Sequence, residues 1–497
     1  MKQTRRTFLA SAAALPAAMQ TSKPNILFLM ADQHRADCVG VDGNAVIQTP
    51  NLDRIANEGI RFRHAYSSTP TCTPARAALL TGLSPWHHGL LGTGPVGRKY
   101  AFTLPQALRD SGYYTQVIGK CHYAPQRNLH GFHHGILDES GRVGSVDFRS
   151  DYRAWFYTQA PNLDPDATGV GFNDYKGKAY VLPERLHPTA WTADVAVNFL
   201  KTYQRPEPFF LKVSFARPHS PYDPPERWMR RYGETNLPAA KVGKWVPEEY
   251  ARRSWDRDDI WHGDMGPAET RTARQAYYGS VSFIDEHIGR ILEALEQRGQ
   301  LENTLILYTS DHGDMTGDHH LWRKSYAYEA SARIPMLMRW PKGLVSAGRG
   351  MVSDKPVEIR DIAATCLDAA GATTAHKLDG LSMLNAARGR GEWRQFIDLE
   401  HDVCYDITNH WNALTDGRTK YIFHARSGQE QLFDVGSDPR ELADLAGDRQ
   451  HEAALRLWRN RMIAHFEERG EAFVRNGRLA LRPERLGFSP LYPRNTA

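Results

Sequence analysis

Cys72 lies in the part of the sequence that most clearly predicts chemistry. It begins the pattern C-T-P-A-R, in which Pro74 suits the first position of a helix that continues to Thr81 and ends at Gly82. Cys72 is therefore expected at a helix N-terminus, where free backbone N–H groups and the helix dipole favour an anion. Such a position suits a reactive thiolate, and it equally suits a cysteine that packs at a helix cap.

Four apolar segments elsewhere in the chain each end abruptly in polar residues. Residues 25–30 are followed by Asp32, Gln33 and His34, residues 113–118 by Lys120 and His122, residues 209–215 by Arg217 and His219, and residues 304–308 by Asp311 and His312. Apolar segments of this length and composition indicate buried strands. Carboxylates such as those of Asp32 and Asp311 suit a hard divalent cation, and imidazoles such as that of His219 suit proton transfer.

Helical patterns separate these predicted strands. Apolar residues recur at three- and four-residue spacing over residues 52–58, 104–111, 192–203 and 277–298. Alternating strands and helices predict a mostly parallel sheet that is covered by helices on both faces. Ligands of such sheets bind beyond the carboxyl ends of the strands, which is where all four polar clusters lie. We therefore expect the clusters to form one site.

The chain divides into a large and a small unit. Residues 23–385 are predicted to form the catalytic domain, because the periodic pattern weakens only near residues 381–390. Strand-like segments at 419–424 and 431–435, a turn at residues 436–439 and a helix at 452–468 then predict a small α+β C-terminal domain over residues 386–497. Residues 478–497, rich in Arg and Pro, are expected to form an extended arm.

The first 22 residues are typical of a twin-arginine signal segment. Arg5 and Arg6 precede a run of small and apolar residues at positions 10–18 that is too short to span a bilayer, and no later segment is long enough to do so. Such a segment predicts export of the folded protein, so the mature protein is expected to be periplasmic or secreted.

Composition excludes several classes of function. The formal net charge is +5, from 62 basic and 57 acidic residues, and Lys2, Arg5 and Arg6 supply three of these positive charges within the signal segment. The remainder lacks the basic excess of a nucleic-acid-binding protein. The five cysteines are odd in number and widely spaced and form no C-x-x-C pair, so neither a disulfide framework nor a thiolate zinc site is expected.

The pattern C-x-P-x-R, continued by A-A-L-L-T-G at positions 77–82, resembles the signature of the type I sulfatases, which belong to the alkaline phosphatase superfamily. The likeness extends in the family's order from Lys23 to at least Met383, and it includes Q-L-F-D at 431–434 and D-P at 438–439. The resemblance implies an alkaline-phosphatase-like α/β fold: a large mixed, mostly parallel sheet sandwiched by helices. It also implies a sulfuric ester hydrolase in which a formylglycine-generating enzyme has oxidised Cys72 to formylglycine.

The resemblance further implies a site for one divalent cation. The positions that match the family's ligands are Asp32, Gln33, Cys72, Asp311 and His312. Commoner members have Asp and Asn at the second and last of these positions, so this chain is more similar there to choline sulfatases and phosphonate monoester hydrolases. Carboxylate oxygens suit Ca²⁺, Mg²⁺ or Mn²⁺; Ca²⁺ is the first expectation, and the imidazole makes Mn²⁺ the second.

Five further residues match catalytic positions of the family. Arg76 is expected to hold the hydrated formylglycine, and Lys120 and Lys324 to bind the sulfate oxygens. One hydroxyl of the hydrate would attack sulfur while His219 protonates the departing alcohol. His122 is expected to bond to residue 72 and to act as the base when sulfate is released.

Three functions remain open from the sequence. The first is hydrolysis of an aryl or carbohydrate sulfate ester, that is, of a small-molecule or oligosaccharide substrate. The second is hydrolysis of a phosphonate monoester or phosphodiester by the same machinery. The third is a protein that binds sulfated glycans without turnover, which predicts loss of catalytic residues such as Lys120, His122, His219 or Lys324; all four are present.

Other patterns are weaker. The G-x-G-x-x-G sequence at residues 92–97 follows a predicted helix, not a strand, so we interpret it as a loop. Among three pairs of adjacent histidines, His88 and His320 are the ones expected to meet the substrate. The charged segment 248–264, which contains Trp255 and Trp261, is interpreted as a solvated excursion near the pocket that could help select the substrate.

Overall fold

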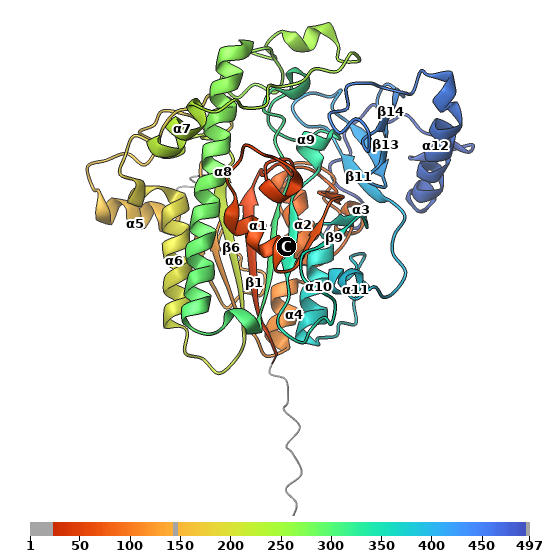
Figure 1. The fold of residues 1–497 in the computed structure, drawn as a ribbon. Helices are drawn as coiled ribbons and strands as arrows, with labels where there is room; N and C mark the ends of the chain where they lie inside the picture. The colour runs from red at the N-terminus through yellow and green to blue at the C-terminus, as the bar shows by residue number, and fades with distance from the viewer. Residues whose placement is uncertain (1–22, 143–147, 494–497) are drawn as a thin grey trace, which may run out of the picture.

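An eight-stranded sheet forms the centre of the computed structural model, which describes residues 23–142 and 148–493 (Figure 1). Along the sheet, the strands are β5 (His134–Leu137), β4 (Tyr114–Gly119), β6 (Phe209–Pro218), β1 (Asn25–Asp32), β7 (Thr304–Ser310), β8 (Met336–Arg339), β2 (Ile60–Phe62) and β9 (Met351–Ser353). The strands from β5 to β7 are parallel, whereas β8 is antiparallel to both β7 and β2. The prediction of a mixed, mostly parallel sheet is confirmed.

Helices cover both faces of this sheet. One face carries α1 (Pro50–Asn57), α6 (Pro188–Thr202) and α8 (Gly266–Gln297), and the other carries α2 (Cys72–Thr81), α4 (Leu104–Asp110), α10 (Asp361–Ala370) and α11 (Met383–Ala387). Figure 1 shows α6 and α8 side by side along the first face. The remaining elements of this part are α3 (Pro85–His88), α5 (Asp151–Gln159), α7 (Glu226–Gly233), α9 (Glu329–Ala332) and the short parallel pair β3 (Ala65–Tyr66) and β10 (Val357–Glu358).

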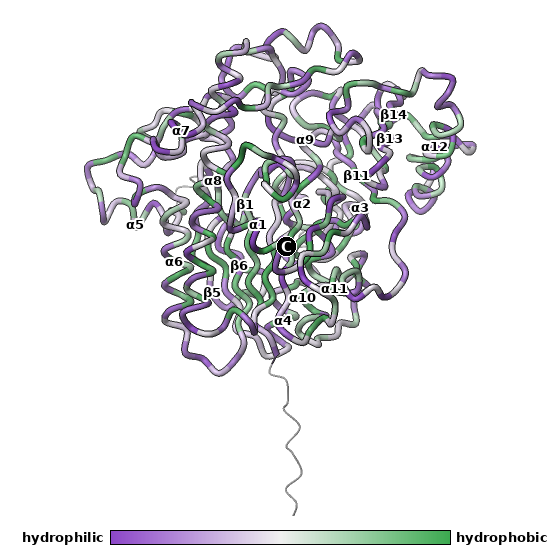
Figure 2. The backbone as a smooth tube through the Cα atoms, in the orientation of Figure 1, coloured by the Kyte–Doolittle hydropathy of each residue, from purple (hydrophilic) through white to green (hydrophobic). Residues whose placement is uncertain are grey.

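The central strand β1 shows why both faces are apolar. Ile26, Phe28 and Met30 pack against α2, α4 and α10, whereas Leu27 and Leu29 pack against α1, α6 and α8. Successive side chains of a strand point to opposite faces, so a strand buried on both sides is continuously apolar. Figure 2 shows this hydrophobic character along β1 and β6. Each of these fully buried side chains stabilises the fold by about 1.5–3 kcal/mol.

The predicted elements agree with the structure except at some boundaries. The helix expected from residue 277 already begins at Gly266, with Pro267 in its first turn. Its first half escaped the periodicity because Arg274 is buried there, 3.4 Å from the carboxylate of Asp318, so a charged residue occupies a core position. The helix after Cys72 begins at Cys72 itself, which makes Pro74 its third residue and not its first.

The C-terminal part contains a four-stranded antiparallel sheet (upper right in Figure 1). Its elements are β11 (Ile397–His401), β12 (Trp411–Thr415), β13 (Thr419–His424), β14 (Glu430–Asp434), α12 (Glu452–Phe466) and the hairpin of β15 (Val474–Arg475) and β16 (Arg478–Leu479). Leu432 faces α12 and contacts the cluster that contains Trp458, whereas Phe433 packs with Tyr328 of the larger part. The predicted α+β character is confirmed.

The last described residues return to the larger part of the molecule. Leu90 and Phe488 form an isolated antiparallel bridge, and the N–H of Leu91 donates to the carbonyl of Gly487 at 3.1 Å. This return brings Arg485 close to the N-terminal end of α2, as described below. The arm expected from residue 478 is therefore extended, and it is hydrogen-bonded to the larger part of the molecule.

Within the described ranges, every helix is too short or too polar to cross a bilayer. The signal segment predicted over residues 1–22 lies outside these ranges.

Candidate active site

Four side chains with ligand atoms for a metal converge at the carboxyl edge of the large sheet. Asp32, Cys72, Asp311 and His312 are all buried, and one ligand atom of each lies within 4.8 Å of those of the others. Asp32 ends β1 and Asp311 follows β7, its parallel neighbour, so the two carboxylates leave the sheet at the same edge. The sequence prediction that these residues form one site agrees with this geometry.

Cys72 lies at the start of α2, where the helix dipole favours a negative charge. Its Sγ is 3.1 Å from Nε2 of His312 and 3.8 Å from Oδ1 of Asp32. Burial and the charge of Asp32 act to raise the pKa of the thiol, but Lys324, His312 and Lys120 bring this pKa below its ordinary value. The position is therefore electrostatically suited to an anionic group at residue 72.

Arg76 lies one turn after Cys72 in α2, and its guanidinium pairs with the carboxylates of both Asp32 and Asp311. Its Nη2 is 2.9 Å from Oδ2 of Asp32 and 2.9 Å from Oδ2 of Asp311, and Nζ of Lys120 is 2.8 Å from the same Asp32 oxygen. Burial alone would raise the pKa of Asp32, yet these cations and His219 hold it well below its usual range. The guanidinium of Arg76 thus contacts the two carboxylates, and its expected contact with the hydrated formylglycine at residue 72 stays a prediction.

The donor set fits a divalent cation. Because Arg76 takes Oδ2 of each carboxylate, Oδ1 of Asp32 and Oδ1 of Asp311 face His312, at 4.0 and 3.7 Å from its Nε2. Nδ1 of His312 donates to the carbonyl of Gly313 at 2.9 Å, so in the neutral imidazole Nε2 carries the lone pair that a metal needs. Two carboxylate oxygens and an imidazole suit a hard or borderline divalent ion.

Gln33 lies beside this donor set, but its amide is already occupied. Its Oε1 accepts a hydrogen bond from Nζ of Lys324 at 2.9 Å, and its Nε2 donates to Asp314. Its backbone N–H donates to Oδ1 of Asp311 at 3.0 Å. Gln33 thus orders Lys324 and Asp311, and its expected role as a direct ligand stays a prediction.

Lys324 and His219 form a close pair next to Cys72. Nζ of Lys324 is 2.7 Å from Nε2 of His219, and Nδ1 of His219 is 2.7 Å from the carbonyl oxygen of Ser220. Phe172 stacks on the imidazole of His219, with the ring centres 4.5 Å apart. The pKa of His219 is well below its usual value because of burial and the neighbouring Lys324 and Lys120.

An open cavity of about 520 Å³ lies above Cys72, and we call it the active-site cavity. It is lined by Thr71, Cys72, Thr73, Thr93, His122, Arg142, Phe172, Asn173, Arg323, Lys324, Ser325, Val403, Cys404, Tyr405 and Arg485. His122 therefore faces the same space as Cys72, as expected. No hydrogen bond joins the two side chains within the described residues, and Nδ1 of His122 has no partner there. Burial, Arg142 and Lys120 hold the pKa of His122 well below its usual value.

Several expectations about the surroundings of the cavity were wrong. Neither His88 nor His320 lines it: His88 is buried and accepts the N–H of Leu90, and the backbone of His320 bonds to Gly263. The segment 248–264 is mostly exposed, as expected, but Trp261 within it is buried and its ring lies parallel to that of Tyr405, 6.2 Å away. Trp261 thus supports the cavity wall. The segment lies near the pocket, as expected, whereas the burial of Trp261 was not expected. The G-x-G-x-x-G sequence is a loop, as predicted.

Sequence reasoning missed the residues that form the upper wall of the cavity. Phe172, Arg323 and Tyr405 come from three separate loops, and Arg485 comes from the returning C-terminal arm. Arg323 directly precedes Lys324, which is the one signal in the sequence that pointed to this wall. The others belong to no pattern that sequence periodicity reveals.

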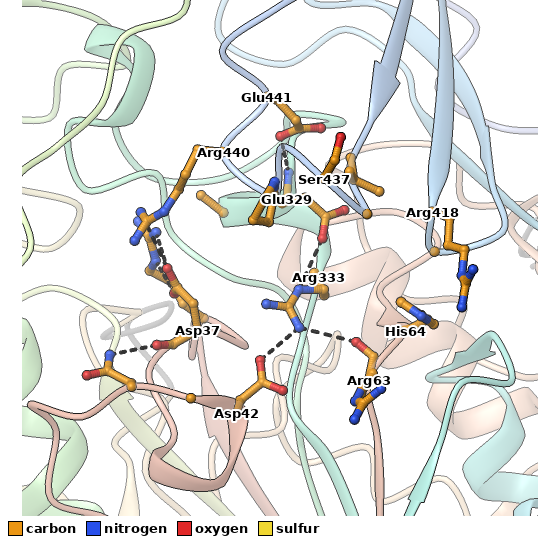
Figure 3. Close-up of a pocket in the computed structure, with 18 of the residues that line it drawn as sticks. Asp37, Asp42, Arg63, His64, Glu329, Arg333, Arg418, Ser437, Arg440 and Glu441 are labelled. Atoms are coloured by element: carbon orange, nitrogen blue, oxygen red, sulfur yellow. Dashed lines mark hydrogen bonds and ion pairs between the residues drawn. The ribbon is translucent and has the colours of Figure 1, made fainter.

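A second cavity, of about 1000 Å³, lies between the two parts of the molecule (Figure 3). Most of its charged groups pair with one another: Arg333 is 2.8 Å from Asp42 and 3.0 Å from Glu329, and Arg440 lies 3.6 Å from Asp37. Because most of its cations and carboxylates are paired, it offers no reactive constellation comparable to that around Cys72.

Comparison with known proteins agrees with this site. The model of the sulfatase family matches residues 24–372, and the model described as N-sulphoglucosamine sulphohydrolase, C-terminal, matches residues 317–468. The chain is 37% identical to an arylsulfatase of Clostridium perfringens (92% of this chain, 97% of the relative) and 28% identical to an N-acetylglucosamine-6-O-sulfatase of Bacteroides thetaiotaomicron (91% and 89%).

A solved structure extends the comparison. The phosphonate monoester hydrolase of Agrobacterium radiobacter superposes with a TM-score of 0.76 at 25% identity, covering 90% of this chain and 96% of that protein. The alkaline-phosphatase-like architecture expected from the sequence is thus confirmed. The chain belongs to the sulfatase family and is an enzyme that hydrolyses sulfate esters.

Proposed function

We propose that the enzyme releases inorganic sulfate from an aryl or carbohydrate sulfate ester bound in the active-site cavity. The observation that carries this proposal is the convergence of Cys72, Asp32, Asp311 and His312 beneath the cavity, with the Lys324–His219 pair beside them. The named activities of the arylsulfatase and the N-acetylglucosamine-6-O-sulfatase support these two substrate classes.

The chemistry requires two groups that the family implies. The hydrate of a formylglycine derived from Cys72 would supply an oxygen nucleophile, and a divalent cation held by Asp32, Asp311 and His312 would lower the pKa of its hydroxyl group. The oxygen-rich donor set favours Ca²⁺, and the imidazole also allows Mn²⁺ or Mg²⁺. The protein oxygens and His312 Nε2 are already oriented by Arg76 and Gly313, so little rearrangement is needed to bind the ion.

The other side chains divide the handling of charge and protons. Lys324, at the cavity wall, places an ammonium group where a sulfate oxygen would lie, and Lys120 balances the charge of Asp32 beneath it. The Lys324–His219 pair holds a proton for the departing alcohol. His122 lines the cavity with an unpartnered Nδ1, which suits it to accept the proton that is lost when sulfate is released.

Release of sulfate from 4-nitrophenyl sulfate and from N-acetylglucosamine 6-sulfate tests the proposal. Wild-type enzyme that was produced together with a formylglycine-generating enzyme should release sulfate from at least one of them, and Cys72→Ala should release none. Cys366→Ala is the matched control, because Cys366 is a buried free cysteine in α10, away from the cavity. Full activity of Cys72→Ala would contradict the proposal.

A second candidate activity is hydrolysis of phosphonate monoesters or phosphodiesters. Gln33 and His312 resemble the corresponding residues of such enzymes, and the fold superposes on the phosphonate monoester hydrolase of Agrobacterium radiobacter. Comparing kcat/KM for an aryl sulfate with that for an aryl phosphonate monoester separates the two activities. A much higher value for the phosphonate would make the second activity the principal one.

We also propose that residues 1–22 direct export through the twin-arginine pathway, which carries folded proteins, so that oxidation of Cys72 and metal loading precede export. The support is the Arg5-Arg6 pair before a short apolar run. Replacing both arginines by lysine should retain the enzyme in the cytoplasm, whereas unchanged export would contradict this assignment.

A further inference from the structure

The active-site cavity has a strongly cationic lining. Arg142, Arg323, Lys324 and Arg485 all line it, and no carboxylate among the described residues does so. Lys324 is engaged at the reacting centre by Gln33 and His219. The three arginines therefore supply positive charge that cleavage of the sulfate ester does not itself require.

Arg323 differs from the other two arginines in having no carboxylate partner within the described ranges. Arg142 is 2.7 Å from Glu139, and Arg485 is 3.4 Å from Asp402. Arg323 donates only through Nη1, to the backbone carbonyl of Asp259 at 2.6 Å, and its Nε has no hydrogen-bond partner although the residue is only 8% exposed. A buried guanidinium without a counter-ion is costly, so an anion in the adjoining cavity would stabilise this charge.

The cavity wall holds this guanidinium in place. It lies over the ring of Tyr405, 4.5 Å from the ring centre, and the Tyr405 ring is in turn supported by Trp261. Arg323, Ser325 and Tyr405 all have left-handed backbone conformations, with φ of 68°, 81° and 65°. Such conformations cost about 1–3 kcal/mol each in residues other than glycine and cluster at ligand sites. The surrounding fold thus imposes the orientation of these side chains.

We propose, on the basis of the function proposed above, that the enzyme prefers sulfate esters whose alcohol part carries a second negative charge, and that Arg323 is the residue that determines this specificity. A carboxylate or a second sulfate on the alcohol would pair with the guanidinium of Arg323 and neutralise its charge in a partly water-excluded space. A neutral alcohol leaves this guanidinium unpaired. Phe172, Val403 and Tyr405 supply the apolar wall for the ring that joins the two anionic groups.

Three aryl sulfates test this preference: neutral 3-methoxyphenyl sulfate, 3-carboxyphenyl sulfate and benzene-1,3-diyl disulfate. For each anionic ester we take the ratio of its kcat/KM to that of the neutral ester. This ratio is measured in wild type, Arg323→Gln and Arg323→Lys. Comparing the ratios between variants cancels the differences in leaving group. Arg323→Gln should lower the ratio at least about tenfold, chiefly through KM, which is the factor expected for one charge-assisted hydrogen bond. Arg323→Lys should retain part of the wild-type preference for the anionic esters. The two anionic esters distinguish a carboxylate-selective from a sulfate-selective site.

Arg257→Gln is the matched control, because Arg257 also stacks on an aromatic residue, Trp255 at 4.4 Å, but does not line the cavity. Its ratio should equal that of the wild type. An unchanged ratio in Arg323→Gln would overturn the proposal. Melting temperatures show whether each variant is folded. If Arg323→Gln is not folded, the ratio measured for Arg323→Lys is compared with that of the wild type instead.

Calorimetric binding of the same esters to Cys72→Ala separates this inference from the proposed function. Tighter binding of the anionic esters, lost when Arg323→Gln is added, supports the specificity even if wild-type enzyme releases no sulfate; in that case only the proposed function fails. Turnover of all three esters, with equal binding of the anionic and neutral ones, supports the proposed function and overturns the role of Arg323.

Discussion

The ammonium nitrogen of Lys324 lies 2.7 Å from Nε2 of His219, whose Nδ1 faces the carbonyl oxygen of Ser220. A carbonyl oxygen can only accept a hydrogen bond, so Nδ1 carries the proton and Nε2 accepts from Lys324. His219 is therefore neutral, in agreement with its depressed pKa, which is due mainly to burial. The pair, not the histidine alone, holds the proton that a departing alcohol needs.

Lys324→Met should consequently lower kcat most for esters with poor leaving groups. We expect kcat for a sugar sulfate to fall about 10²- to 10⁴-fold, the range for general acid catalysis, and kcat for 4-nitrophenyl sulfate to fall much less, because nitrophenolate departs without a proton. Steady-state kinetics on both esters measure the difference, with Lys342→Met as an exposed-lysine control. Equal losses on the two substrates would show that Lys324 binds sulfate but does not assist the leaving group.

Phe172 should position His219 through its stacked ring. A Cβ at Gly141 would lie 2.3 Å from the Phe172 ring, so Gly141→Ala should displace Phe172 and lower kcat/KM about tenfold. Gly169→Ala is the matched control: Gly169 has a similar φ of 68° against 67° for Gly141, but open space around its Cβ. If both variants lose activity equally, backbone strain rather than displacement of Phe172 is the cause.

Removal of the cation should destabilise the folded enzyme, because the donor set exists only in the folded state. Chelation should lower Tm, and Ca²⁺ at about 100 times its Kd should restore about 2.7 kcal/mol of stability. Added Ca²⁺ should raise the stability of Asp311→Asn much less than that of the wild type. It should raise the stability of Asp354→Asn, a change at an exposed surface ion pair, as much as that of the wild type. Calorimetry with and without added Ca²⁺, Mn²⁺ or Mg²⁺ tests this. A full response in Asp311→Asn would contradict the assignment of this carboxylate.

A buried charge cluster joins the two parts of the chain and should make stability depend on pH. Lys420 is 2.8 Å from both Glu329 and Glu441, and burial raises the pKa of Glu441 from 4.5 to about 7. Because the folded state binds this proton more tightly than the unfolded state, the contribution of Glu441 to stability is largest at acid pH and falls as pH rises from about 4.5 to about 7.

Lys420→Met should make the folding stability fall more steeply as pH rises. Removing the ammonium group leaves the buried carboxylate of Glu441 without a cationic partner, whereas Glu329 keeps Arg333 at 3.0 Å. The loss should cost about 3–5 kcal/mol at pH 8 and less at pH 5, where Glu441 can take up a proton. Denaturant unfolding at both values measures the cost, with Lys201→Met as an exposed-lysine control. A deficit that is equal at pH 5 and pH 8 would show that the cluster does not titrate in this range.

Much of the catalytic sheet was predictable, because strands that are buried on both faces leave continuous apolar segments. This signal located β1, β4, β6 and β7, and the polar residues after them located Asp32, Lys120, His219 and Asp311. Cys72 followed from the helix that begins there. These predictions succeeded since each depends on local periodicity or on a short pattern.

The upper wall of the cavity was not predictable for physical reasons. Arg323 and Tyr405 depend on left-handed backbone conformations that arise from tertiary packing, and Arg485 depends on the return of the C-terminal arm to the larger part. The burial of Trp261 likewise follows from its contact with a distant segment. Local sequence carries no record of such long-range contacts, so the packing of Trp261 behind the cavity wall was not predicted.

The central claim is that residue 72 acts as a formylglycine above a divalent cation. Mass spectrometry of the proteolytic peptide that contains residue 72, from enzyme fractions of known specific activity, tests it most directly. The fraction of peptide with the mass of formylglycine should rise in proportion to the activity of the fraction. Fully active enzyme in which that peptide carries only an unmodified cysteine would contradict the account.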